Sequence, residues 1–188
     1  MKEVIEEHKQ VLSSLEKYTS LIEKIATLCI SSLKKGGKIV FCGNGGSAAD
    51  SQHLAAELVG RFLKEKKPLA SLALSVNTSI LTAVGNDYGF GKIFSKQIEA
   101  LGEPKDLLIA ISTSGNSKNV IEAVRKAKEK GIKTIGFLGK DGGKLKKIVD
   151  IPLIVESNNT ARIQEMHILI GHILCEIIEE EYIEKSSK

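Results

Sequence analysis

The chain has 188 residues, of which 42% are hydrophobic and 27% charged, and its net charge is +4. A chain of this length and composition can bury a sizeable core within one domain, which excludes intrinsic disorder as the default. The positive charge is mild and scattered, whereas a nucleic-acid-binding protein usually gathers its basic residues on one element. We interpret the two short lysine groups, at residues 64–67 and 144–147, as solvated turns and predict no nucleic-acid partner.

The sequence also lacks the patterns of secretion and membrane insertion. The first ten residues, MKEVIEEHKQ, are too charged for a signal peptide. The most apolar stretch, residues 69–84, is interrupted by serine, threonine and asparagine and cannot form a membrane-spanning helix. Cys29, Cys42 and Cys175 lie far apart among apolar neighbours, which is typical of reduced, buried thiols. These features predict a cytoplasmic protein with no membrane partner.

The first 35 residues have the period of one long helix. Spacings of four and three residues alternate along a seam of Val4, His8, Val11, Leu15, Tyr18, Ile22, Ile25 and Cys29. The helix is expected to stop at Gly36-Gly37. Because a helix of this length exceeds what one small domain needs, we expect residues 1–35 to pack along another long helix and to form an oligomer interface.

Residues 36–188 alternate short apolar runs with helical segments. Strands are expected at 38–42, 69–74, 106–111, 133–137 and 151–155, and helices at 47–63, 78–84, 90–101, 117–130 and 160–182. This alternation predicts an α/β fold, with a parallel sheet covered by helices on both faces. Residues 1–188 show no linker, so we predict a single domain. Ligands of such sheets bind at the carboxyl ends of the strands.

A glycine-rich loop, Gly43–Ala49, follows the first expected strand. Its glycines allow close backbone approach, and the helix behind it directs N–H groups at an anion. The loop satisfies G-x-G-x-x-A, but the next strand ends in Leu74-Ser75-Val76-Asn77 without the acidic residue that a dinucleotide site needs. The G-x-x-x-x-G-K-[ST] pattern of nucleoside triphosphatases is absent. Alone, this loop is equally consistent with a structural turn.

A second loop strengthens the prediction of an anion site. Four hydroxyls, those of Ser112, Thr113, Ser114 and Ser117, lie at the turn after the third expected strand. A helix cap needs one hydroxyl, whereas several hydroxyls together with free N–H groups form a neutral phosphate cradle. Neither loop contains Lys or Arg, which favours a small phosphomonoester over a nucleotide.

Four motifs in the same order resemble phosphoheptose isomerases of the sugar isomerase (SIS) domain superfamily: GNGGSAADSQHLAAEL, VGNDYGF, ISTSGNS and ARIQEMHILIGH. The resemblance covers nearly the whole chain. It implies a three-layer α/β/α sandwich around a five-stranded parallel sheet, in a cytoplasmic homotetramer. It implies conversion of D-sedoheptulose 7-phosphate to D-glycero-D-manno-heptose 7-phosphate, the first step toward the heptose of lipopolysaccharide cores and other surface glycans. It also implies one zinc ion per subunit.

Site residues follow from the resemblance by position. The metal ligands would be His53, Glu57, Gln164 and His172. The substrate contacts would be Asn44, Gly45, Gly46, Glu57, Asn86, Asp87, Ser112, Thr113, Ser114, Ser117 and Gln164. This chain has Ala161 where some members of the family carry Asp, so any step assigned to that carboxylate does not transfer.

The chemistry of aldose–ketose isomerisation agrees with these positions. The reaction needs a base at C1 and C2, a group for the hydroxyl protons and stabilisation of an enediolate. His53 and Glu57 share one helix face, and we expect Glu57 to be the base and His172 its acid/base partner. A Glu bound to zinc is a poor base, so the metal leaves, shifts or serves mainly as an organiser. Gln164 and His172 lie about 12 Å apart along one helix, so they either lean together or come from different subunits.

Two other classes of function remain open on sequence alone. A non-catalytic SIS domain, either a sugar-phosphate sensor or a partner of the replication initiator, would keep the phosphate loops without needing His53, Glu57, Gln164 and His172 together. A different SIS enzyme would act on a hexose phosphate, a pentose phosphate or an amino-sugar ether.

Overall fold

The computed structural model describes residues 1–183 and contains one sheet of five parallel strands. The strands are β1 (Ile39–Cys42), β2 (Ser71–Ala73), β3 (Leu107–Ser112), β4 (Lys133–Gly139) and β5 (Ile151–Val155). Their order is β2-β1-β3-β4-β5, and every neighbouring pair is parallel. The predicted α/β fold with a five-stranded parallel sheet is therefore confirmed.

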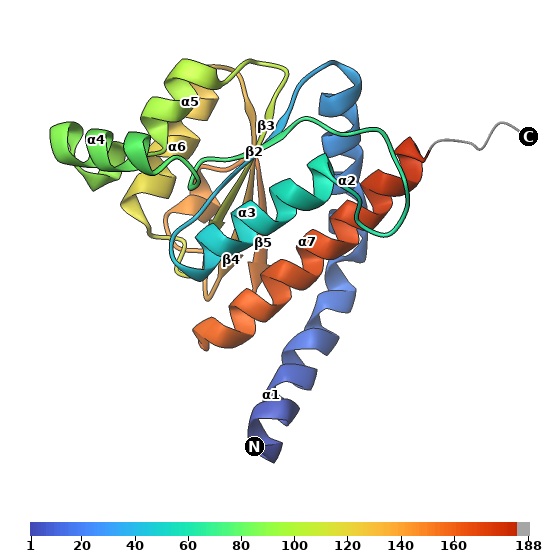
Figure 1. Ribbon diagram of the computed structural model, residues 1–188. Helices are drawn as coiled ribbons and strands as arrows, with labels where there is room; N and C mark the ends of the chain where they lie inside the picture. The colour runs from blue at the N-terminus through green and yellow to red at the C-terminus, as the bar shows by residue number, and fades with distance from the viewer. Residues whose placement is uncertain (184–188) are drawn as a thin grey trace, which may run out of the picture.

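Helices cover both faces of the sheet and complete three layers (Figure 1). One face carries α2 (Thr19–Lys34), α3 (Gly46–Val59) and α7 (Thr160–Tyr182), and the other carries α4 (Thr78–Tyr88), α5 (Ser95–Leu101) and α6 (Lys118–Glu129). Side chains alternate across β1, so that Ile39 and Phe41 join the first core and Val40 and Cys42 join the second. Every residue of α4 is at least partly exposed, and α4 projects from the body of the domain (Figure 1).

The strand order creates a topological switch point between β1 and β3. From β1 the chain crosses to β2 on one side, whereas β3 leads to β4 and β5 on the other. Ligands of open parallel sheets bind in the crevice at such a point, beyond the carboxyl ends of the strands. The two loops singled out in the sequence, after β1 and after β3, therefore meet at the same place.

The N-terminal helix is not continuous as expected. It consists of α1 (Lys2–Ser13), a 3₁₀ segment (Ser14–Tyr18) and α2. The hydroxyls of Ser13 and Ser14 bond back to the carbonyls of Lys9 and Val11, at 2.9 and 2.6 Å, and such bonds compete with the regular helical ladder. The seam still packs inward, since Val11, Leu15, Ile22, Ile25 and Cys29 are buried.

Three further expectations need correction. The helix expected at 47–63 ends at Val59, because Gly60 and the segment after it leave the helical path. The helix expected at 90–101 is a 3₁₀ turn, Phe90–Lys92, followed by α5. Lys66 is buried rather than solvated, and its ammonium donates to the carbonyls of Leu58, at 2.8 Å, and Gly60.

The cysteines agree with the prediction of buried thiols. The three cysteines are free and buried. No helix within residues 1–183 is both long and apolar enough to cross a bilayer.

Candidate active site

The glycine-rich loop and the serine-rich loop are joined by a pair of amide side chains. Asn44 Nδ2 donates to Asn119 Oδ1 at 2.9 Å, and Asn119 Nδ2 donates to Asn44 Oδ1 at 2.8 Å. Asn44 lies between β1 and α3, and Asn119 is the second residue of α6. Sequence reasoning found Asn44 but missed Asn119, although an amide directly after the serine-rich loop was the available signal.

The hydroxyls of the second loop form a local network rather than a conventional helix cap. Ser117 precedes α6, but its Oγ lies 3.1 Å from Ser112 Oγ, and its side chain makes no capping bond to the helix. Ser114 Oγ accepts from the backbone N–H of Asn116 at 3.2 Å. Ser117 therefore leaves the N–H groups of Lys118 and Asn119, the first two of α6, available for an anion, which favours a phosphate cradle over a helix cap.

A glycine with positive φ shapes the same loop. Gly115 has φ of +63°, and an added Cβ would lie 2.0 Å from the carbonyl oxygen of Gly142. Only glycine fits this close approach of two backbones. The turn after β4, which contains Gly142, thus packs directly against the serine-rich loop.

Gln164 lies beside the glycine-rich loop. A Cβ on Gly46 would be 1.8 Å from Gln164 Nε2, so the amide of Gln164 rests directly on the backbone of Gly46. Helix α7 begins just before, where Asn159 Oδ1 caps the helix by accepting from the N–H of Ala161 at 3.0 Å. The structure thus places Gln164 beside the glycine-rich loop, and its predicted roles as substrate contact and metal ligand stay predictions.

A second group of predicted residues gathers where α3 crosses α7. His53 Nε2 lies 2.9 Å from His172 Nε2 and 3.4 Å from Glu57 Oε1. The crossing is close because Gly171 has no side chain: a Cβ there would lie 2.5 Å from Leu54 Cδ1. We call His53, Glu57 and His172 the acid/base group. All three were predicted, and the structure brings them together within one subunit.

The segment after α3, residues 62–64, lies beside the acid/base group. The ring of Phe62 packs against His172 with centroids 5.5 Å apart. Glu179, two turns further along α7, accepts from the backbone N–H groups of Phe62, Leu63 and Lys64, each at 2.9 Å. Burial opposes ionisation of Glu179, but these three N–H groups outweigh it and lower the pKa of the carboxyl. Sequence reasoning missed both Phe62 and Glu179.

The acid/base group matches zinc in donor chemistry more closely than in arrangement. Two imidazole nitrogens and a carboxylate are typical zinc ligands, and tetrahedral ligands at about 2.0–2.1 Å from the ion would lie about 3.3 Å apart. The 3.4 Å separation of His53 and Glu57 fits that edge, whereas the 2.9 Å separation of the imidazoles is a hydrogen bond. Residues 1–183 contain no group of three or more His, Cys, Asp or Glu placed to hold a metal ion. Gln164, the fourth predicted ligand, lies beside Gly46 at the glycine-rich loop, and zinc binding stays a prediction.

Asn86 and Asp87 lie on α4 and are exposed, with Asn86 Nδ2 donating to Asp87 Oδ1 at 2.8 Å. A hollow of about 180 Å³ adjoins the cradle between the glycine-rich loop and the start of α5. It is lined by Gly43, Asn44, Gly45, Ala48, Ser75, Leu81, Phe90, Ile93 and Phe94. Asn86 and Asp87 are not part of this lining, and their contact with substrate stays a prediction.

The two remaining histidines lie outside these groups. His167 is fully buried and its Nε2 lies 2.9 Å from the carbonyl oxygen of Leu138. Burial lowers the pKa of His167 to about 4. His8 Nδ1 lies 2.7 Å from Glu165 Oε2 and ties α1 to α7. Neither histidine belongs to the phosphate-binding loops or to the acid/base group.

Comparison with known proteins first defines the class. The family model of the SIS domain matches residues 4–139, which is more than half of the chain. The chain is 54% identical over 181 residues to a phosphoheptose isomerase of Nitratiruptor sp., covering 96% of this chain and 97% of the relative. It is 56% identical over 177 residues to phosphoheptose isomerase 1 of Campylobacter jejuni, covering 94% and 95%.

A solved structure agrees with these relatives. The phosphoheptose isomerase of Neisseria gonorrhoeae superposes with a TM-score of 0.90 at 46% identity, covering 95% of this chain and 96% of that one. The chain belongs to the phosphoheptose isomerase family of SIS-domain proteins.

Proposed function

We propose that the chain is an aldose–ketose isomerase that converts D-sedoheptulose 7-phosphate to D-glycero-D-manno-heptose 7-phosphate. This reaction begins the biosynthesis of the heptose of lipopolysaccharide cores or surface polysaccharides. The observation that carries the proposal is the acid/base group at the α3–α7 crossing, found in a chain that also holds a neutral phosphate cradle. A sensor of sugar phosphates would need only the cradle. The free, buried cysteines support a reducing, cytoplasmic setting.

The acid/base group supplies the two proton transfers that the isomerisation needs. Glu57 takes the proton from C1 of the ketose and returns it to C2 of the enediolate. His172 gives a proton to the carbonyl oxygen at C2 and takes one from the hydroxyl at C1, so that protons balance over the cycle. The contact between His53 and His172 fixes the imidazole that shuttles these protons, and Phe62 shields it on another side.

The phosphate is held at the switch point. The hydroxyls of Ser112, Thr113, Ser114 and Ser117 and the N–H groups at the start of α6 donate to the phosphate oxygens. Asn44, Gly45 and Gly46 close the other side of the cradle. This binding fixes the phosphate end of the sugar. Selectivity for the length of the sugar must therefore come from residues outside the cradle.

We infer that one subunit cannot bring both groups to the same substrate molecule. Gly46 and Glu57 are eleven residues apart on α3, which is about 16 Å of helix rise. Seven bonds of about 1.5 Å join C2 of the substrate to its phosphorus, so the two ends of the substrate are closer than about 10 Å. A second copy of the chain that brings its acid/base group to this cradle would remove the mismatch. This supports an active site shared between subunits.

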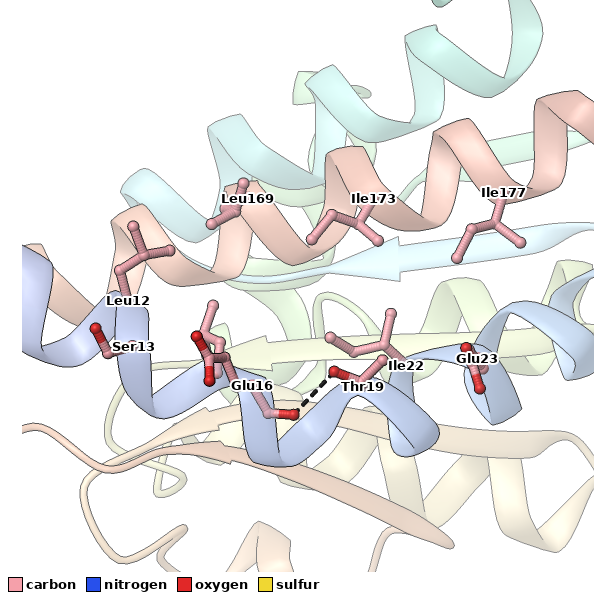
Figure 2. A pocket seen from close by; sticks show the side chains of 10 residues that line it. Leu12, Ser13, Glu16, Thr19, Ile22, Glu23, Leu169, Ile173 and Ile177 are labelled. Carbon is pink, nitrogen blue, oxygen red and sulfur yellow. Dashed lines mark hydrogen bonds between the residues drawn. The ribbon is translucent and has the colours of Figure 1, made fainter.

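An exposed apolar groove offers a surface for association with another subunit (Figure 2). It has a volume of about 420 Å³ and lies between the N-terminal helices and α7. Its apolar lining is Leu12, Leu15, Ile22, Leu169, Ile173 and Ile177. Figure 2 shows Leu169, Ile173 and Ile177 in a row along α7, facing the N-terminal helices. We propose that a second copy of the chain covers this groove and that the protein is a homotetramer.

Zinc binding remains a prediction, at one ion per subunit. His53, Glu57 and His172 would hold it, with Gln164 as the fourth predicted ligand. When bound, zinc would supply Lewis-acid stabilisation of the enediolate. Elemental analysis of the purified protein, compared with the His53→Ala variant, tests this prediction without reference to activity. Equal metal content in the two proteins would contradict it.

Mixed oligomers test the shared site. The Glu57→Gln variant keeps the cradle, and a Ser112→Ala, Ser117→Ala double variant keeps the acid/base group, so each alone is expected to be inactive toward sedoheptulose 7-phosphate. Co-refolded mixtures of the two should regain turnover, because some sites then combine an intact cradle with an intact acid/base group. Inactive mixtures that form mixed oligomers would show that each site lies within one subunit. Each variant refolded alone is the control.

A further inference from the structure

We propose that Asn119 is a positioning residue that fixes the amide of Asn44 and joins the two halves of the phosphate cradle into one rigid unit. The proposal rests on the proposed function, in that the cradle is taken to bind the phosphate of the substrate. It concerns a residue that no motif in the sequence singled out. The evidence is the reciprocal amide pair between the glycine-rich loop and the start of α6, which joins residues 75 positions apart.

The two amides of this pair differ in burial. Only 2% of Asn119 is exposed, whereas Asn44 is half-buried at the edge of the cradle. A buried amide needs partners for its polar atoms, and Asn119 has them in Asn44 and in the backbone N–H of Val120, which donates to its Oδ1 at 3.0 Å. Asn119 is thus satisfied within the protein, and its partner Asn44 lines the hollow beside the glycine-rich loop.

The N–H of Val120 determines which way both amides face. It can donate only to an oxygen, so Oδ1 of Asn119 must point toward it, and Nδ2 must take the other position. That orientation requires Asn44 to present Nδ2 to Asn119 Oδ1 and Oδ1 to Asn119 Nδ2. One Nδ2–H and one lone pair of Asn44 are left for a ligand, each in a fixed position.

Neutral amides suit an anion site better than a charged pair would. A carboxylate at position 119 would keep the bonds from Asn44 Nδ2 and Val120, but it would place a negative charge near the phosphate. Without any side chain there, the glycine-rich loop would lose its link to α6. The identity of Asn119 therefore matters through Asn44 and through its neutrality, not through direct contact with the substrate.

The test compares the binding of sedoheptulose 7-phosphate, and of inorganic phosphate as a second probe, by titration calorimetry. The variants are Asn119→Ala, Asn44→Ala and the double variant, and kcat and KM are measured beside Kd. We expect Asn119→Ala to raise Kd and KM about tenfold, the size of one hydrogen-bond contribution, with kcat changed much less. In the Asn44→Ala background, Asn119→Ala should add little further change, because Asn119 acts through Asn44.

A matched control separates positioning from stability. Thr134 is fully buried at the amino end of β4, far from the cradle. Its hydroxyl donates to Asp150 Oδ2 and accepts from the backbone N–H of Asp150. Thr134→Val should lower the melting temperature without changing Kd. Equal rises of Kd in Thr134→Val and Asn119→Ala would show that Asn119 acts only on stability. Fully additive effects of Asn44 and Asn119 would also overturn the proposal, as would an Asn119→Asp variant that binds like the wild type.

The binding readout keeps this proposal distinct from the proposed function. A wild-type protein that binds the sugar phosphate without turning it over would refute the isomerase, while the changes in Kd would still decide the role of Asn119. A wild-type protein that binds neither sedoheptulose 7-phosphate nor inorganic phosphate would overturn both.

Discussion

Replacing Gly171 by alanine should damage catalysis far more than stability. An alanine Cβ at this position would lie 2.5 Å from Leu54 Cδ1 and Cδ2 and 3.0 Å from Leu54 Cγ, where ordinary contacts lie at 3.4–4 Å. Leu54 is only 1% exposed, so it has no free space to enter, and α3 and α7 must separate by about 1 Å. Leu54 adjoins His53 and Gly171 adjoins His172, so the separation acts directly on the acid/base group.

The contacts around Gly171 give the expected loss of stability and the expected loss of rate. Overpacking of a buried contact costs about 1–3 kcal/mol. Alanine is favoured over glycine in a helix by about 1 kcal/mol, which offsets part of that cost and leaves a net loss of about 0–2 kcal/mol. A misplacement of about 1 Å at reacting groups costs about 100-fold in rate. The assay measures urea unfolding and kcat for the Gly171→Ala variant.

A second variant serves as the stability control. Gly85 lies in α4, and a Cβ there would meet only Ile93 Cγ2, at 3.8 Å. Gly85→Ala should therefore gain about 0.5–1 kcal/mol from helix propensity alone. The difference between the two alanine variants isolates the cost of the crowded crossing.

Removing the side chain of Leu54 tests whether its clash with the alanine Cβ causes the loss of activity in Gly171→Ala. Leu54→Ala alone should destabilise the protein by about 2–5 kcal/mol through the cavity it leaves. Combined with Gly171→Ala, its cost should fall by about 1–3 kcal/mol, and much of kcat should return. A Gly171→Ala variant with wild-type kcat would refute the reasoning, and so would a loss of kcat that Leu54→Ala does not relieve.

Three further predictions concern single side chains. Glu57→Gln should abolish turnover and leave the unfolding free energy and phosphate binding unchanged, as measured by calorimetry; residual turnover would contradict its role as the base. Protonation of His167 favours the unfolded chain, because its pKa of about 4 lies below the ordinary value of about 6.5, so stability should fall by about 2 kcal/mol from pH 7 to pH 5. Urea titrations of the His167→Gln variant should show that its stability depends less on pH than that of the wild type. An unchanged pH dependence would argue against this role of His167. Glu179→Gln should lower the free energy of unfolding by about 2–4 kcal/mol and speed amide exchange in residues 62–64. Because the pKa of Glu179 is lowered in the folded protein, its contribution to stability is lost only in acid, as pH falls below the ordinary Glu value of about 4.3.

The fold could be predicted because local patterns agreed with one another. Each strand is a short apolar run that ends at a turn signal, and the carboxyl ends of β1 and β3 carry the loops rich in Gly, Ser and Asn. The i, i+4 spacing of His53 and Glu57 places both on one face of α3, and their closeness to each other followed from that spacing. His172 entered the predicted group only through the family resemblance, because its own surroundings in the sequence are typical of a buried helix.

What the sequence left out depends on contacts between distant segments. No local pattern pairs Asn119 with Asn44, or makes Glu179 accept from three N–H groups of a loop more than a hundred residues earlier. The same loop redirects Lys66 inward, where its ammonium meets carbonyls at the end of α3, so its place in a run of lysines was misleading. The break in the N-terminal helix arises from serine hydroxyls that compete with the helix, which residue periodicity does not reveal.

The most direct test of the isomerase is turnover of sedoheptulose 7-phosphate in heavy water, followed by proton NMR. We expect an aldoheptose phosphate that carries deuterium at C2, because Glu57 exchanges its proton with solvent before returning it. The same reaction with the Glu57→Gln variant should give no product. A wild-type protein that binds the sugar phosphate but forms no aldose, with or without added zinc, would contradict the account and favour a non-catalytic sugar-phosphate sensor.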